Sequence, residues 1–224
     1  MDRTRATRLW PKTIPAAQKV QEILRKQVRV TPLKKVPGFI GAVDASFLDK
    51  AILAVASLYT FPDLIPVQDV WIEEEVRFPY VPGFLSFREG HAMVSALKKL
   101  RISPDLLLVD GQGIAHPKGI GIASHLGVIL DRPTIGCAKS RLVGEFCGPA
   151  QERGSWEYLY YQGEAVGAVV RTRDHTKPLY ISPGHRVDIL SSVEIILKCV
   201  SRYRIPEPLR RADSLSRRLA REAF

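Results

Sequence analysis

The sequence predicts an α/β protein in which helices cover a mixed β-sheet, and three observations support this fold class. Residues 39–47, 51–59 and 67–78 are rich in β-branched and aromatic residues and are separated by short breaks, which is typical of neighbouring antiparallel strands. Beyond residue 83, segments of helical periodicity alternate with short apolar runs, which indicates buried parallel strands. The 224 residues, 46% of them hydrophobic, allow one globular domain with a large core and exclude a disordered chain.

The remaining elements follow from the same patterns along the chain. Apolar residues at intervals of three and four predict helices, whereas short continuous apolar runs predict strands. We expect helices over residues 15–30, 83–100, 119–130, 184–200 and 208–223, and further strands over residues 105–110, 134–137 and 179–182. The segment 156–172 indicates a hairpin that turns at Gln162 and Gly163.

Composition limits the class of protein further. The longest largely apolar stretch, residues 51–59, is much shorter than the roughly 20 residues that span a bilayer, and no charged-then-apolar leader opens the chain. The three cysteines have no CxxC spacing, so neither a disulfide framework nor a thiolate zinc site is indicated. We therefore expect a soluble, cytoplasmic protein with reduced cysteines and no membrane partner.

Positive charge is concentrated at the two ends of the chain. Residues 1–35 hold ten Lys and Arg against two acidic residues, and residues 200–224 hold seven against three, so the ends carry +8 and +4 of the total +10 and the middle carries −2. This distribution fits a core that carries the chemistry and ends that bind phosphate backbones. Two solvated basic helices that only keep the protein in solution fit the charges equally well.

Two aspartates stand where a carboxylate is costly. Asp44 lies within the apolar strand at residues 40–47, and Asp110 ends the apolar run at residues 106–109. Burying an unpaired carboxylate costs several kcal/mol, so each needs a cation or a hydrogen-bond network. Two such strands side by side would bring both carboxylates to one point, where a hard divalent metal would stabilise them. The alternative is an aspartate that caps a turn, which suits Asp110 before Gly111 better than Asp44.

Other polar residues give weaker signals. Glu89, taken alone, fits a solvated residue of an amphipathic helix, and His125 fits a buried core histidine. The turn at residues 110–117 combines a carboxylate, two glycines and His116, so a ligand could approach its backbone closely, although a ligand-free glycine turn fits as well. Lys139 follows a short strand and could meet a phosphate.

The segment 79–83 is short and stiff, because its two prolines have fixed φ angles. A rigid tip that carries an aromatic residue, here Tyr80, can wedge between stacked bases. A packed connection between a strand and a helix is the alternative interpretation.

Taken together, these segments resemble the endonuclease V family over nearly the whole chain. The matching segments are residues 41–47, 78–83, 87–90, 110–113, 122–125, 138–140, 182–185 and 205–208. Each is weak alone, but their order and spacing are specific. The resemblance implies a ribonuclease H-like fold whose first three strands are antiparallel, and hence one catalytic domain over residues 1–224 with basic terminal helices.

The resemblance also implies an activity. Family members are DNA repair enzymes that cut the second phosphodiester on the 3′ side of a deaminated base, chiefly inosine, and leave 3′-hydroxyl and 5′-phosphate ends. They use Mg²⁺, for which we expect Mn²⁺ to substitute. Asp44, Glu89 and Asp110 resemble the family's metal-binding carboxylates, and Asp213 falls where members carry histidine or aspartate. Lys139 resembles the lysine near the scissile phosphate, where it would offset developing negative charge.

The recognition residues transfer in the same way. The tip at residues 79–82 resembles the family's strand-separating wedge, and the damaged base would turn out of the stack into a pocket. The residues expected to bind the substrate are Pro79, Tyr80, Val81, Pro82, Gly83, Leu85, Gly111, His116, Gly121 and Ile122.

Three alternatives stay open at this point. A non-catalytic basic binding module would lack at least one acid, and none is missing at the matched positions. A junction nuclease of the same fold could use the same carboxylates, but it would not need the tyrosine wedge. The family also contains members that prefer inosine in RNA, and the sequence does not distinguish these from DNA-specific members. We expect a monomer.

Overall fold

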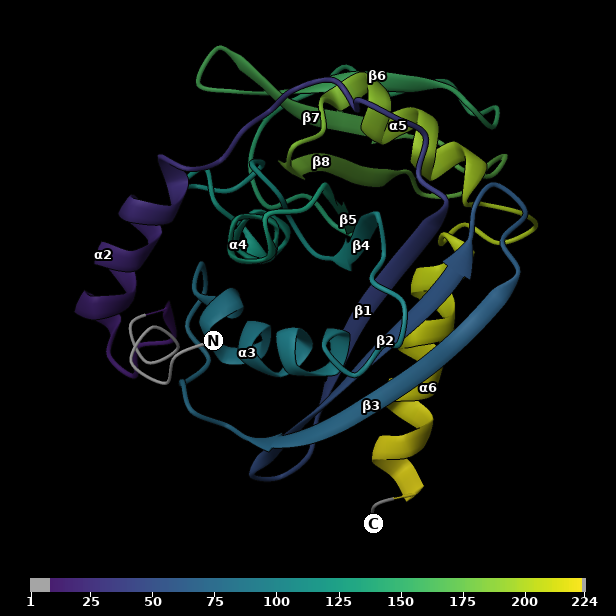
Figure 1. The fold of residues 1–224 in the computed structure, drawn as a ribbon. Coiled ribbons are helices and arrows are strands. Elements are labelled where there is room, and N and C mark those ends of the chain that lie inside the picture. The colour runs from purple at the N-terminus through teal and green to yellow at the C-terminus, as the bar shows by residue number, and fades with distance from the viewer. Residues whose placement is uncertain (1–8, 223–224) are drawn as a thin grey trace.

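A computed structural model describes residues 9–222 of the chain (Figure 1). Its helices are α2 (Ile14–Arg25), α3 (Leu85–Leu97), α4 (Ile122–Leu130), α5 (Ile189–Lys198) and α6 (Glu207–Glu222). Its strands are β1 (Phe39–Phe47), β2 (Ala51–Thr60), β3 (Pro66–Glu75), β4 (Leu106–Asp110), β5 (Thr134–Ala138), β6 (Trp156–Tyr161), β7 (Glu164–Val170) and β8 (Leu179–His185). No helix among these described residues is long and apolar enough to span a membrane.

All eight strands belong to one mixed sheet in the order β3-β2-β1-β4-β5-β8-β7-β6. The first three strands are antiparallel, β1, β4 and β5 are parallel, and β8, β7 and β6 continue the sheet in antiparallel order. This confirms the expected ribonuclease H-like fold class, with an antiparallel first half followed by parallel strands. The hairpin of β6 and β7 was expected too, whereas the antiparallel pairing of β8 with β5 and β7 goes beyond the expectation.

Alternation along the strands divides the core into two layers. In β1, Ala42 faces the layer that contains Ala212 of α6, whereas Val43 faces the layer that contains Met93 of α3. Successive side chains of a strand point to opposite faces, so the two apolar layers require helices on both sides of the sheet. Figure 1 shows α3 and α6 on the two sides of the long strands β1 to β3.

Several expected boundaries are wrong. The helix expected from residue 184 begins only at Ile189, because residues 183–185 continue β8. The helix expected over residues 15–30 ends at Arg25, the strand expected to reach residue 78 ends at Glu75, and the helix expected from residue 119 begins at Ile122. Residue 223, the expected end of the last helix, lies outside the described residues.

Other local expectations are confirmed. The hairpin between β6 and β7 turns at Gln162 and Gly163, whose φ angles of 54° and 82° are both positive, as a two-residue turn matched to strand twist requires. Cys137, Cys147 and Cys199 are free, and the first and last of them are buried.

Candidate active site

The register of the sheet places two carboxylates side by side. Val43 of β1 pairs with Val109 of the parallel strand β4, so Asp44 and Asp110 follow at neighbouring positions. Ala42 and Leu108, two residues earlier, both belong to the core layer on the α6 side. Because side chains alternate along a strand, Asp44 and Asp110 also point toward α6.

The last helix adds a third carboxylate. Asp213 lies on α6, and the carboxylate oxygens of Asp44, Asp110 and Asp213 lie within 4.8 Å of one another. One turn further along α6, the Ser216 hydroxyl donates a hydrogen bond to Asp44 Oδ2 at 2.6 Å and accepts one from Ser46 at 3.0 Å. Residues from β1, β4 and α6 thus form one acidic centre at the point that the sequence predicted from Asp44 and Asp110.

Cations border this centre. The Lys139 ammonium group donates hydrogen bonds to Asp110 at 2.5 Å and to Asp213 at 3.2 Å. Arg217 donates to Asp213 at 2.7 Å. Burial alone lowers the pKa of Lys139, but the hydrogen bonds and charges of Asp110 and Asp213 outweigh it, so its pKa is raised overall and the ammonium form is retained.

Negative charge still crowds the centre. Burial raises the pKa of Asp44 to about 6; the Ser216 hydrogen bond opposes this rise and the charges of Asp110 and Asp213 add to it. Glu89 is only 8% exposed, and burial together with the charges of Asp44 and Asp110 raises its pKa to about 8. A solvated role for Glu89 is therefore wrong. Glu89 lies on α3, near enough for the charges of Asp44 and Asp110 to affect its pKa, and is not one of the three mutually close carboxylates.

These donors fit a hard divalent cation. All are carboxylate oxygens, the ligands that Mg²⁺ and Mn²⁺ prefer, and their mutual repulsion is what a divalent charge would relieve. A site for metal at Asp44, Asp110 and Asp213 is consistent with both the geometry and the raised pKa of Asp44.

A cavity of about 440 Å³ opens beside the acidic centre. Asp110 and Lys139 belong to the acidic centre and also line the cavity, so the cavity and the carboxylates form one continuous site. Of the residues expected to bind the substrate, all except Pro79 line this cavity: Tyr80, Val81, Pro82, Gly83, Leu85, Gly111, His116, Gly121 and Ile122.

The segment beside the cavity is buried where it begins, at Phe78, and exposed at Tyr80. Phe78 is 1% exposed and packs against Phe84 and Phe87. Tyr80, two residues along, is 70% exposed. The start of this segment is therefore a packed connection, whereas the Tyr80 side chain is accessible to a partner.

The two histidines near the cavity differ in surroundings. His116 is 6% exposed and lines the cavity, and burial lowers its pKa to about 4, so it is neutral at pH 7. His125 is fully buried, its Nδ1 lies 2.9 Å from the Ser86 hydroxyl, and its ring stacks on Trp10. His125 is thus the core histidine that the sequence suggested.

Sequence reasoning missed several lining residues. They are Ser86, Gln112, Ile120, Ala138, Ser140, Arg141 and Leu142. Gln112 gave a signal, since it stands between two glycines of the singled-out turn, and its amide donates to the Ser140 carbonyl at 3.1 Å. Arg141 and Leu142 follow Lys139 in an irregular loop, where no periodicity marks which side chains face inward.

The fold and the site together define a class: a ribonuclease H-like protein with an acidic centre where the parallel pairing of β1 and β4 ends. The family model described as endonuclease V matches residues 22–214, a range that includes all four acids of the site. The chain belongs to the endonuclease V family.

Individual relatives agree with this assignment. Endonuclease V of Dictyoglomus turgidum is 49% identical over 201 residues, covering 90% of this chain and 88% of the relative. The crystal structure of endonuclease V from Streptomyces avermitilis has a TM-score of 0.91 and 40% identity, with 96% of each chain covered. Endonuclease V of Ciona intestinalis, solved with a 24mer DNA containing an inosine followed by a ribo-adenosine, has a TM-score of 0.84 over 96% of this chain and 100% of that chain; at 23% identity it shows a shared fold.

Proposed function

We propose that this protein is a DNA repair endonuclease that recognises deaminated bases, chiefly deoxyinosine. It hydrolyses the second phosphodiester on the 3′ side of the lesion and leaves 3′-hydroxyl and 5′-phosphate ends. The observation that carries the proposal is the continuity of the acidic centre with the cavity through Asp110 and Lys139. A base held in the cavity would leave the strand that follows it beside the carboxylates.

The cavity suits a single flipped base. Its volume of about 440 Å³ lies within the range of small-molecule sites, and Tyr80 stands exposed at its edge, where it could fill the gap that the base leaves. Hypoxanthine offers O6 as an acceptor and N1–H as a donor, the reverse of adenine. Backbone groups that the lining glycines leave accessible could read this difference.

Asp44, Asp110, Asp213 and Glu89 would hold Mg²⁺, with Mn²⁺ as a substitute. A metal bound there would supply Lewis-acid polarisation of the phosphate and would make an attacking water more acidic. Ser216 fixes the carboxylate of Asp44 in orientation. Lys139 lies at the boundary of centre and cavity, where its positive charge would offset charge that develops on the scissile phosphate.

The wider proposal concerns the whole chain. Residues 1–224 would act as one catalytic domain in the cytoplasm, as a monomer, and the basic ends would contact phosphates that flank the lesion. The alternatives are inosine-specific cleavage of RNA and, less favoured because of the exposed tip and the base-sized cavity, cleavage of branched DNA.

Two end-labelled strands that differ only in adenine or inosine at one position test the proposal, each made as DNA and as RNA. With Mg²⁺ we expect a single cut one nucleotide 3′ of inosine, at the second phosphodiester after the lesion, and no cut in the adenine strand. The ratio of DNA to RNA cleavage decides between the two polymers. Equal cutting of adenine and inosine strands, or cutting of a branched duplex without inosine, contradicts deaminated-base recognition.

A further inference from the structure

The wedge segment joins α3 through a flexible residue. Gly83 separates the tip residues 79–82 from α3, lines the cavity, and has a φ angle of 82°. This left-handed region is accessible to glycine at no steric cost. With no side chain to hold it, the peptide between Gly83 and Phe84 depends on its own hydrogen bonds for its orientation.

A glutamine from the first described helix holds the carbonyl of that peptide. Gln21 of α2 donates from Nε2 to the Gly83 carbonyl oxygen at 2.8 Å, across 62 residues of sequence. Gln21 is 3% exposed, on the same buried face of α2 as Ala17 and Leu24. Burying a glutamine on an apolar helix face is unfavourable unless its amide is bonded, so this contact is specific.

His116 supports the same glycine from the other side of the cavity. Its Nδ1 accepts a hydrogen bond from the backbone N–H of Lys118 at 3.1 Å, so the single proton of the neutral ring is on Nε2. Nε2 lies 3.8 Å from the position of a Cβ on Gly83, and the ring hydrogen-bonds the backbone of Gly83. The Gly83 carbonyl thus accepts its hydrogen bond from Gln21, and the His116 ring lies beside the same glycine.

The nitrogen end of the peptide is fixed as well. The N–H of Phe84 donates to the Val81 carbonyl at 3.0 Å. The peptide plane is thus held at both ends, by Gln21 at its carbonyl and by the tip itself at its N–H. Without Gln21, rotation of this plane about glycine would exchange the directions of its C=O and N–H groups.

We propose that Gln21 is a positioning residue that fixes the Gly83–Phe84 peptide, and through it the wedge and the cavity wall that distinguish hypoxanthine from adenine. The inference rests on the proposed function. Because the two bases present opposite donor and acceptor patterns, a wall whose C=O and N–H directions can exchange discriminates poorly. Recognition groups also have to be held within about 0.5 Å to be selective.

The test compares Gln21→Met with Gln18→Met. Methionine has nearly the shape of glutamine and lacks the donor, and Gln18 is an exposed glutamine on the same helix. Binding to matched inosine and adenine DNA strands is measured in EDTA, and kcat and KM for the inosine strand are measured with Mg²⁺. We expect Gln21→Met to reduce the inosine preference about tenfold, as loss of one hydrogen bond implies, and to raise KM more than it lowers kcat. Gln18→Met should match wild type.

A second variant distinguishes a loss of positioning from a loss of folding. Gln21→Glu keeps the side-chain length and replaces the donor with an acceptor, so its loss of preference should be at least as large. If wild type prefers inosine and both Gln21 variants keep that preference, or lose only stability to urea, the positioning role is wrong and the proposed function stands. If wild type itself has no preference, the proposed function fails and the inference falls with it.

Discussion

Asp44 accepts a hydrogen bond from Ser216, a partner that the sequence did not predict. The sequence predicted that a carboxylate in an apolar strand needs partners, and the structure supplies Ser216 at 2.6 Å and Lys139 near the same centre. Ser216 carries no signal of its own, because a serine on a polar helix is ordinary. It faces Asp44 only because α6 packs across β1, which is a tertiary arrangement.

Tyr80 is the exposed residue whose role is most open to test. It is 70% exposed beside the cavity, so Tyr80→Ala removes no core packing. We expect the variant to bind an inosine strand about tenfold more weakly, because a base–aromatic contact contributes about 1–3 kcal/mol, while the cleavage rate at saturating strand changes little. Electrophoretic binding and single-turnover cleavage separate the two effects.

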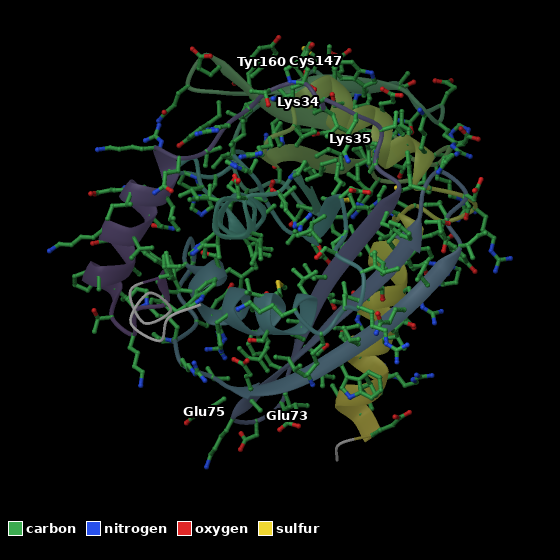
Figure 2. The ribbon with its side chains drawn as sticks, in the orientation of Figure 1. Lys34, Lys35, Glu73, Glu75, Cys147 and Tyr160 are labelled. Carbon is green, nitrogen blue, oxygen red and sulfur yellow. The ribbon has the colours of Figure 1, made fainter. Side chains whose placement is uncertain are left out.

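Tyr160→Ala is the matched control, since Tyr160 is also an exposed tyrosine, at 45%, and does not line the cavity. It lies near Cys147 at one end of the molecule (Figure 2). Equal loss of binding to inosine and adenine strands in Tyr80→Ala would contradict a wedge.

His125 predicts a pH dependence of stability. Burial lowers its pKa to about 3 in the folded protein, whereas an unfolded histidine titrates near 6.5. The unfolded chain therefore binds a proton at this residue below pH 6.5 and the folded chain does not, so the contribution is full above pH 6.5 and is lost as pH falls toward 3. Between pH 6 and 4, the unfolding free energy of wild type should fall about 1.4 kcal/mol per pH unit more steeply than that of His125→Phe. Urea titrations give both slopes, and parallel slopes would show that His125 titrates normally.

Among the elements, a strand flanked by clear breaks was predictable from the sequence. A strand that continues through a bulge was not. The bounds expected for β1 agree with the structure residue for residue. A strand was expected over residues 179–182 and a helix from residue 184, yet β8 continues to His185. An irregularity opposite Thr134 and Ile135 absorbs the extra residue, and such a bulge depends on the partner strand rather than on local sequence.

The strand β5 also packs closely against the turn that follows Asp110. A Cβ on Gly136 would lie 2.5 Å from the Gly113 nitrogen and 2.7 Å from the Gly111 oxygen, so no side chain fits where β5 passes the turn after Asp110. We expect Gly136→Ala to destabilise the protein by about 1–3 kcal/mol and to reduce cleavage by displacing Asp110. In the control Gly38→Ala, the nearest atom would lie at 3.5 Å, an ordinary contact, and thermal unfolding should be nearly unchanged. A fully stable and active Gly136→Ala would contradict close packing at this turn.

Across the described part of the molecule, the basic helices α2 and α6 do not form one patch. Figure 1 shows α2 and α6 at opposite sides of the protein, with the sheet between them. On α6, Arg211 pairs with Asp69 and Arg217 with Asp213, so part of the positive charge is internally compensated. Figure 2 shows the exposed residues Lys34 and Lys35 far from the labelled acids Glu73 and Glu75, so these basic and acidic residues do not pair with each other. Composition predicted the excess charge, but only the fold determines where it lies.

The four acids of the site also differ in how they could be predicted from the sequence. Asp44 and Asp110 were predictable from local burial, and the fold brings them together because β1 and β4 are parallel neighbours. Asp213 and Glu89 are ordinary helix residues in isolation, and only the resemblance to endonuclease V suggested them. Asp213 comes close to Asp44 and Asp110 because α6 packs on one face of the sheet, and Glu89 is buried because α3 packs on the other.

The most direct test of the central claim separates binding from cleavage at the acidic centre. Wild type and Asp110→Asn are each incubated with one inosine-containing DNA strand in Mg²⁺ and in EDTA, and both bound and cut strand are measured. We expect both proteins to bind the strand, and only wild type with Mg²⁺ to cut it, with a loss in Asp110→Asn of at least about a hundredfold. Cutting by wild type in EDTA, or by Asp110→Asn at the wild-type rate, would contradict a metal-dependent centre built on Asp44, Asp110 and Asp213.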